Sequence, residues 1–335
     1  MRKIEEIRFP LSAFPRAFPL MRILFIGTGD IGLPTLDSLL RSHEHHVLAV
    51  VTQPDKPAGR HQEMQESPIK QLALRHHVPI FQPQKIRERT AVEQLRFLKP
   101  DAIVVMAYGQ ILPGEILRIP SVACLNLHAS LLPRHRGAAP IQAAIEAGDS
   151  ETGVTVMYMA EGLDTGDMLL KKSVPIRRRD TGGSMHDTLA GIAPIALAEA
   201  LTLLKQGRAP RAPQDAALAT YAPKLTRENG GIDWKATQDQ IDRKIRAMNP
   251  WPGAFTFLPT ADGVRKLKVF ACIQHSRNIG EPGTVVRADK HGLLVAAGRG
   301  GVLLREVQIE GKKRMNARDF LIGTLVAPGT VLSAQ

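Results

Sequence analysis

Short apolar runs alternate with stretches of helical spacing between residues 22 and 128. The strand-like runs fall at 22–26, 47–51, 79–81, 102–106 and 125–128, and the helical stretches at 33–40, 67–77 and 90–99. Strands that alternate with helices predict a parallel sheet covered on both faces, with its ligand site at the carboxyl ends of the strands. We therefore expect a Rossmann-like, mostly parallel α/β domain.

The last third of the chain has a different pattern. After a helical stretch at 236–248, glycine turns separate five short strand-like runs at 254–258, 267–273, 283–286, 292–296 and 302–307. Five such strands predict a small OB-like β-barrel. The domain boundaries we predict are 21–206 for the α/β domain, 207–225 for a proline-spaced linker and 226–335 for the barrel.

Residues 1–20 do not fit either pattern. Three prolines and Arg16 interrupt their apolar stretch, which excludes a regular helix and disfavours a secretory segment. A transit peptide is the alternative, but Glu5 and Glu6 disfavour it. We interpret these residues as a disordered or mis-started extension.

Composition indicates an ordinary soluble protein. Apolar residues make up 44% of the 335 and charged residues 23%. No apolar run approaches the roughly 20 residues needed to span a bilayer, so we expect no membrane partner. Only two cysteines, Cys124 and Cys272, are present and lie far apart, which predicts a reducing, cytoplasmic location.

The positive charge is concentrated near the C-terminus. The formal net charge is +12, and residues 208–335 hold 20 Lys or Arg against 11 Asp or Glu. A domain with this surplus attracts polyanions, nucleic acid above all. The alternative is that the charge serves solubility alone.

Two polar residues mark the end of the run at 125–128. Asn126 and His128 lie two positions apart, so in a strand they share one face. An amide donor and a titratable imidazole aimed at one point suit acyl transfer at a carbonyl. Asp164, flanked by Gly162 and Gly166, is a candidate to orient the imidazole, although an Asx-type turn would also explain it.

A rival signal follows the first strand, where residues 27–32 spell G-x-G-x-x-G. This is a dinucleotide fingerprint and would make the chain a nicotinamide oxidoreductase. The second strand lacks an acidic residue at its end, and Asp55 comes only after a proline. The alternative is that these glycines form a tight strand-to-helix turn.

Three further features have ordinary explanations as well as functional ones. The connection from 53 to 67 is rich in Pro, Gly and polar residues, and its Arg60 either reaches a phosphate or is simply solvated. Cys124 shares a strand face with His128 but lies roughly 13 Å away, so we assign it to the core. The histidines at 43–46 lack a metal-binding pattern and are expected to be solvated.

Several of these segments together resemble the signatures of the folate-dependent formyltransferases. They are Asn-Leu-His at 126–128, Ser-Leu-Leu-Pro at 130–133, Arg-Gly-Ala-Ala-Pro-Ile at 136–141 and Gly-Leu-Asp-Thr-Gly-Asp at 162–167. The resemblance implies that Asn126, His128 and Asp164 are catalytic, that 10-formyltetrahydrofolate is the donor, that no metal is needed and that the 27–32 turn is scaffold. It implies folate contacts at Ser130, Leu131, Leu132, Pro133, Tyr108, Gly109, Gln110, Ile111 and Leu112.

Other segments resemble the members of this family whose acceptor is methionyl initiator tRNA. These are Gln-Pro-Asp-Lys-Pro-Ala-Gly-Arg at 53–60, Ile-Asp-Trp at 232–234, and residues 245–254 and 282–284. The resemblance implies formylation of the α-amino group of that tRNA and a tRNA contact at Arg60. We also expect a monomer. One departure is the stretch 61–66, where such members often carry lysines and this chain has two glutamates. An amino-sugar nucleotide is the rival acceptor, and a noncatalytic tRNA-binding protein is the rival class.

Overall fold

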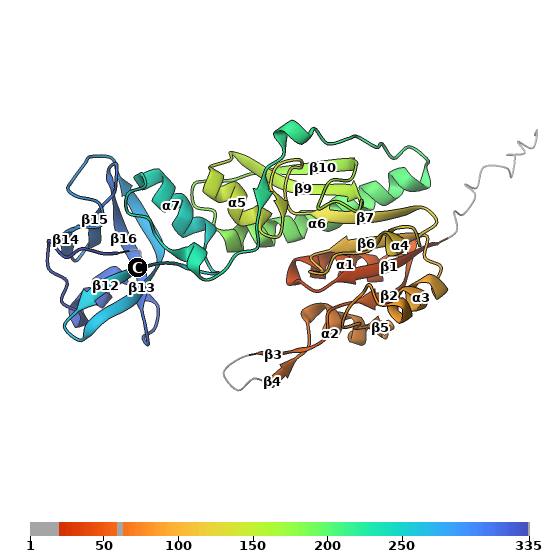
Figure 1. Ribbon diagram of the computed structural model, residues 1–335, viewed down its shortest axis with the longest axis horizontal. Helices are drawn as coiled ribbons and strands as arrows, with labels where there is room; N and C mark the ends of the chain where they lie inside the picture. Colours follow the sequence, from red (N-terminus) through yellow and green to blue (C-terminus); the bar gives the residue numbers. More distant parts are fainter. Residues whose placement is uncertain (1–19, 59–62, 334–335) are drawn as a thin grey trace, which may run out of the picture.

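The computed structural model describes residues 20–58 and 63–333. The chain forms an α/β unit and a β-rich unit that lie side by side and are joined by an extended segment (Figure 1). The proposed extension at 1–20 lies almost wholly outside the described residues, and so does Arg60.

The α/β unit is built on a seven-stranded, mostly parallel sheet, which confirms the predicted class. Five strands run parallel: β1 (Met21–Gly27), β2 (His45–Val51), β5 (Ile80–Phe81), β6 (Ala102–Met106) and β7 (Ala123–His128). β9 (Glu151–Tyr158) pairs antiparallel with β7, and β10 (Met168–Pro175) pairs antiparallel with β9, giving the order β10-β9-β7-β6-β1-β2-β5. These two strands extend the sheet beside β7, the strand that carries Asn126 and His128.

Helices cover both faces of this sheet because its central strands are apolar on both sides. On one face, Phe25 and Leu125 pack with residues of α1 (Leu33–Arg41), α2 (Pro68–Arg75), α5 (Pro140–Ala147) and α6 (Gly182–Lys205). On the other, Leu24 and Cys124 pack with α3 (Arg89–Phe97) and α4 (Gly114–Leu117). Strand residues that alternate between two cores are typical of a doubly covered sheet.

Helix α6 departs from the sequence-based expectation in two ways. The sequence pattern did not predict this 24-residue helix, and by length and composition it is apolar enough to cross a membrane. It packs instead against α1, β9 and β10, and its Leu189, Leu197 and Leu201 are buried. A helix that is apolar on most sides is explained here by burial in a protein core.

The β-rich unit is an antiparallel, OB-like curled sheet, as predicted. Its strands are β12 (Ala254–Thr260), β13 (Gly263–His275), β14 (Val285–Asp289), β15 (Gly292–Ala296), β16 (Gly301–Ile309) and β17 (Met315–Asn316). Ser333 bridges Phe257 of β12, and Val331 bridges Thr284 just before β14, so the end of the chain spans the two edges. β17 and the helix α8 (Ala317–Gly323) were not predicted.

The two units touch through a pair of helices. α5 of the first unit packs against α7 (Gln238–Ala247) of the second, and Lys244 forms an ion pair with Glu146. Trp234 is buried, and its indole Nε1 donates to Thr256 Oγ1 at 3.0 Å. Its role is therefore packing within the β-rich unit.

Two connections expected to be irregular contain local structure. The 53–67 connection holds a two-stranded hairpin of β3 (Lys56–Ala58) and β4 (Glu63–Gln65). Within 207–225, a 3-10 turn at Ala216–Leu218 precedes β11 (Tyr221–Ala222), which pairs in parallel with β8 (Arg136–Gly137). The second of these connections therefore forms part of the α/β unit.

Candidate active site

Strand β7 positions the first two candidate residues. It lies between β6 and β9, and Leu125 and Leu127 are buried in the core on the face opposite Asn126 and His128. Because side chains alternate along a strand, burial of the two leucines fixes the direction of the amide and the imidazole. Asn126 is half-buried, whereas His128 is only 5% exposed.

The loop between β9 and β10 carries Asp164 to the same place. Asp164 itself has a left-handed backbone, with φ of +50°, a conformation that Asp tolerates better than most residues. Neither of the flanking glycines, Gly162 and Gly166, has a positive φ. Gly166 serves a different purpose, because a Cβ there would lie 1.8 Å from the Tyr158 carbonyl oxygen.

The three side chains meet around one carboxylate. Asn126 Nδ2 donates to Asp164 Oδ1 at 3.4 Å, and His128 Nδ1 lies 3.6 Å from Asp164 Oδ2. The Gly137 backbone N–H donates to the same Oδ2 at 2.8 Å. A side-chain amide has two N–H groups, so Asn126 retains one donor for a ligand while the other contacts Asp164.

The second nitrogen of the imidazole is held by the backbone. His128 Nε2 lies 2.9 Å from the carbonyl oxygen of His135. A carbonyl only accepts, so this contact places a proton on Nε2 and leaves Nδ1, which faces Asp164, as the nitrogen able to take up another. The ring thus has a fixed orientation and one free basic position.

The sequence did not predict the roles of Gln214 and Arg136, which stabilise the backbone of the Asp164 loop through hydrogen bonds. Gln214 Nε2 donates to the carbonyl oxygens of Asp164 and Gly166, each at 2.8 Å. Its Oε1 accepts two bonds from the Arg136 guanidinium, at 3.0 and 2.8 Å. Gln214 lies in the proline-spaced connection, where no periodicity or motif indicated a role.

The 130–133 segment is largely engaged with the protein itself. Ser130 is buried and its Oγ donates to the Arg134 carbonyl, while the Leu132 N–H donates to Thr155 Oγ1 at 3.1 Å. Leu131 and Pro133 are only partly buried. Of the four residues expected to contact folate, these two offer accessible side chains.

The 108–112 segment likewise contains both buried and accessible residues. Tyr108 and Leu112 belong to the core under the sheet, and Gln110 bridges to residues 84 and 86 through its amide. Burial raises the pKa of Tyr108 to about 12, and its hydroxyl has no hydrogen-bond partner among the described residues. Gly109 is exposed and Ile111 is 83% exposed, so they form the accessible part of this segment.

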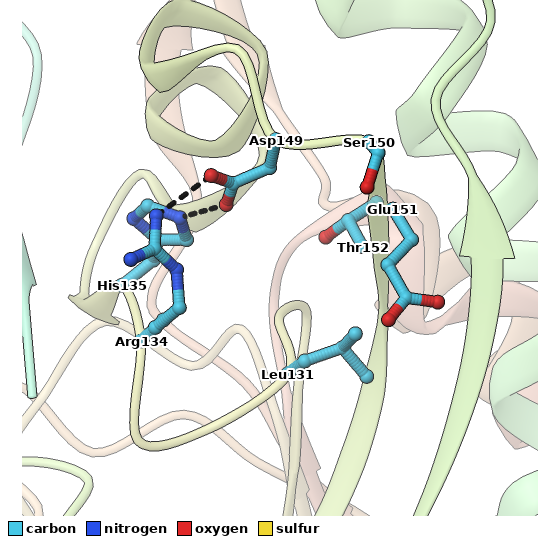
Figure 2. A pocket seen from close by; sticks show the side chains of 7 residues that line it. All are labelled: Leu131, Arg134, His135, Asp149, Ser150, Glu151 and Thr152. Atoms are coloured by element: carbon cyan, nitrogen blue, oxygen red, sulfur yellow. Dashed lines mark hydrogen bonds and ion pairs between the residues drawn. The ribbon is translucent and has the colours of Figure 1, made fainter. Parts of the chain in front are cut away.

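A cavity of about 350 Å³ lies beside the loop that follows β7, and its lining includes Leu131, Arg134 and His135. Figure 2 shows the His135 ring and the Arg134 guanidinium both directed at Asp149, with contacts of 2.7 and 2.6 Å. His135 thus separates the two places, since its carbonyl faces His128 and its ring faces the cavity. None of Asn126, His128 and Asp164 lines this cavity.

Two backbone N–H groups of the glycine turn at 27–32 are hydrogen-bonded within the protein. The N–H groups of Thr28 and Gly29 both donate to the Ala107 carbonyl, at 3.2 and 3.0 Å. A Cβ at Gly27 would lie 2.8 Å from the Met106 carbonyl oxygen. A dinucleotide site needs free N–H groups at this turn to bind pyrophosphate, so the close contact with the end of β6 favours the tight-turn interpretation.

Family models match nearly the whole chain. A model described as formyl transferase matches residues 21–201, and one described as formyl transferase, C-terminal domain, matches residues 224–325. Among curated proteins, the methionyl-tRNA formyltransferase of Methylacidiphilum infernorum is 51% identical, covering 94% of this chain and 99% of that protein. The methionyl-tRNA formyltransferase of Geotalea uraniireducens is 50% identical with the same coverage.

Solved structures share the fold at low sequence identity. WlaRD, described as a sugar 3N-formyl transferase, has a TM-score of 0.63 and 18% identity, covering 88% of this chain and 99% of that one. HypX from Aquifex aeolicus in complex with tetrahydrofolic acid has a TM-score of 0.58 and 19% identity over 90% of this chain. This chain spans about half the length of HypX, 47% of it.

The thiol of Cys124 allows a prediction about nucleophilic catalysis. Burial raises the pKa of this thiol to about 12, so it stays neutral at pH 7 to 8, where the thiolate would be the reactive form. We expect Cys124→Ala to keep at least half of the wild-type activity, and native protein to resist alkylation at this position, as read by mass spectrometry. Activity lost together with rapid alkylation would contradict the core assignment.

Proposed function

The chain belongs to the formyltransferase family, and we propose that it transfers the formyl group of 10-formyltetrahydrofolate to the α-amino group of methionyl initiator tRNA. Two findings support this. Relatives about 50% identical over nearly their whole length are named methionyl-tRNA formyltransferases. The cluster of Asn126, His128 and Asp164 around one carboxylate supplies the chemistry, and it is the observation that carries the proposal.

Each of the three residues has a distinct part in the proposed reaction. The amine nitrogen of the methionyl group attacks the formyl carbon, and negative charge develops on the formyl oxygen. The Asn126 N–H not used by Asp164 donates to that oxygen. His128 Nδ1 takes a proton from the attacking nitrogen, and the Asp164 carboxylate beside it stabilises the imidazolium that forms.

The second half of the reaction returns the proton. The bond between the formyl carbon and N10 of the folate breaks as the carbonyl re-forms, and N10 accepts the proton that His128 received. The product is N-formylmethionyl-tRNA with tetrahydrofolate, and neither a metal nor an acyl-enzyme takes part. All three residues come from one chain, so a monomer suffices.

The accessible parts of two segments support a folate site beside these residues. Ile111 and Gly109 are exposed after β6, the strand that pairs with β7, and Leu131 and Pro133 follow β7 itself. These positions lie near the carboxyl ends of neighbouring strands, where ligands of such sheets bind. HypX, with the same fold, is described in complex with tetrahydrofolic acid.

The charge distribution supports a tRNA acceptor. Most of the surplus of Lys and Arg in residues 208–335 falls in the β-rich unit, where Lys312 and Lys313 are exposed. Such charges attract phosphate without reading sequence. We propose that Arg60 adds a contact from the 53–67 connection, and that the enzyme acts in translation initiation in the cytoplasm.

Substitution of Asn126 tests its assigned role. Removing one oxyanion donor typically costs on the order of 10²- to 10³-fold in rate, so Asn126→Ala should lower kcat by about that factor. KM for either substrate should change little, because the lost bond strengthens only as charge develops. Steady-state kinetics with a thermal unfolding control would check this, and near wild-type turnover would exclude the role.

The acceptor is tested by direct competition. Purified protein with 10-formyltetrahydrofolate is offered charged methionyl initiator tRNA or an amino-sugar nucleotide, and each product is measured. We expect formylation of the tRNA alone, with a rate that falls as salt rises because phosphate contacts are screened. Transfer to the sugar nucleotide without tRNA would overturn the proposed acceptor, and no transfer to either would overturn the function.

A further inference from the structure

The segment that joins the two units runs along the back of the Asp164 loop. The Arg211 guanidinium lies 3.6 Å from the centre of the Tyr158 ring, and Ala212 exchanges two backbone hydrogen bonds with Met168, at 2.8 and 2.9 Å. Tyr158 ends β9 and Met168 begins β10. The joining segment therefore contacts both strands that flank the Asp164 loop, at the end of β9 and the start of β10.

The same segment fixes the opposite side of the site. The Arg136 N–H donates to the Thr220 carbonyl, and the Ala138 N–H donates to the Ala222 carbonyl, both at 2.8 Å. Gly137, between these two, supplies the N–H that binds Asp164 Oδ2. Both partners of that hydrogen bond thus depend on residues between 211 and 222.

Gln214 is the side chain that connects the two sides. Its amide N–H groups hold the backbone of Asp164 and Gly166, and its oxygen accepts from Arg136, which is 5% exposed. A left-handed backbone is uncommon outside glycine, even though Asp tolerates it better than most residues, and contacts from the surroundings stabilise it. The two hydrogen bonds from Gln214 stabilise this backbone conformation at Asp164, where φ is +50°.

We propose that Gln214 is a positioning residue, which sets the Asp164 carboxylate at the distance that Asn126 and His128 require. This inference rests on the proposed function. Gln214 acts through Asp164 rather than on a substrate, so it should affect the chemical step and leave substrate binding unchanged. The segment joining the two units is then a structural part of the active site.

The primary test is Gln214→Glu. A glutamate at this position still accepts from Arg136 but cannot donate to the two carbonyl oxygens. Misplacement of a reacting group by about 1 Å can cost roughly 10²-fold, so we expect kcat to fall about 10- to 100-fold, with KM for tRNA and folate within about 2-fold. Gln206→Glu, the same change at an exposed position outside the site, is the matched control and should keep wild-type kinetics.

A double-mutant cycle separates positioning from a general loss of structure. If Gln214 acts through Asp164, then Gln214→Glu should lower the rate by less than about 2-fold once Asp164 is Asn, because the two changes share one effect. Single-turnover measurements with excess enzyme make the slow variants measurable. An undiminished effect in the Asp164→Asn background would overturn the inference, and so would wild-type kcat in Gln214→Glu.

Two controls keep the outcome unambiguous. If Gln214→Glu does not fold by circular dichroism and thermal unfolding, Gln214→Met, which also lacks the donors, takes its place with the same expectation. Wild-type protein is assayed first with methionyl initiator tRNA. Failure of the wild type would refute the proposed function, whereas an active wild type with fully active Gln214 variants would refute this inference alone.

Discussion

The carboxylate of Asp164 is the interaction on which the site depends. It receives the Gly137 N–H at 2.8 Å, lies within 3.4 Å of the Asn126 amide nitrogen and within 3.6 Å of the His128 ring. These groups come from β7, from the short strand β8 and from the loop between β9 and β10. A partly buried carboxylate with several donors has a defined position, and it gives its neighbours defined positions in turn.

The sheet explains why these segments meet. β7 is the last of the parallel strands, and β9 pairs with it antiparallel, with Asn126 opposite Met157 and His128 opposite Thr155. The chain therefore leaves β9 beside the amino end of β7, where Tyr158 pairs with Leu125. The following loop then brings Asp164 to Asn126. The segment that joins the two units contacts this loop through Gln214, whose amide donates to the carbonyl oxygens of Asp164 and Gly166.

Much of this was predictable because it follows from local patterns. The alternation of apolar residues predicted β7 and the shared direction of Asn126 and His128. The resemblance of the motifs to formyltransferases is confirmed by family models that match residues 21–201 and 224–325. Helix α6 was missed because it is apolar on most sides and shows no amphipathic period. Gln214 was unpredictable, since its partner Asp164 is 50 residues away and only tertiary contact relates them.

The roles of the three residues, the folate contacts and the tRNA contact of Arg60 stay proposals. The most direct test is the single-turnover rate of formyl transfer to methionyl initiator tRNA by Asp164→Asn. Asparagine keeps the shape but removes the negative charge beside His128 and places an N–H donor against the N–H of Gly137 or Asn126. General acid–base assistance is worth about 10²- to 10⁴-fold, so the rate should fall by at least about 10²-fold with tRNA affinity retained. A rate within about 3-fold of wild type would contradict the assignment of this site.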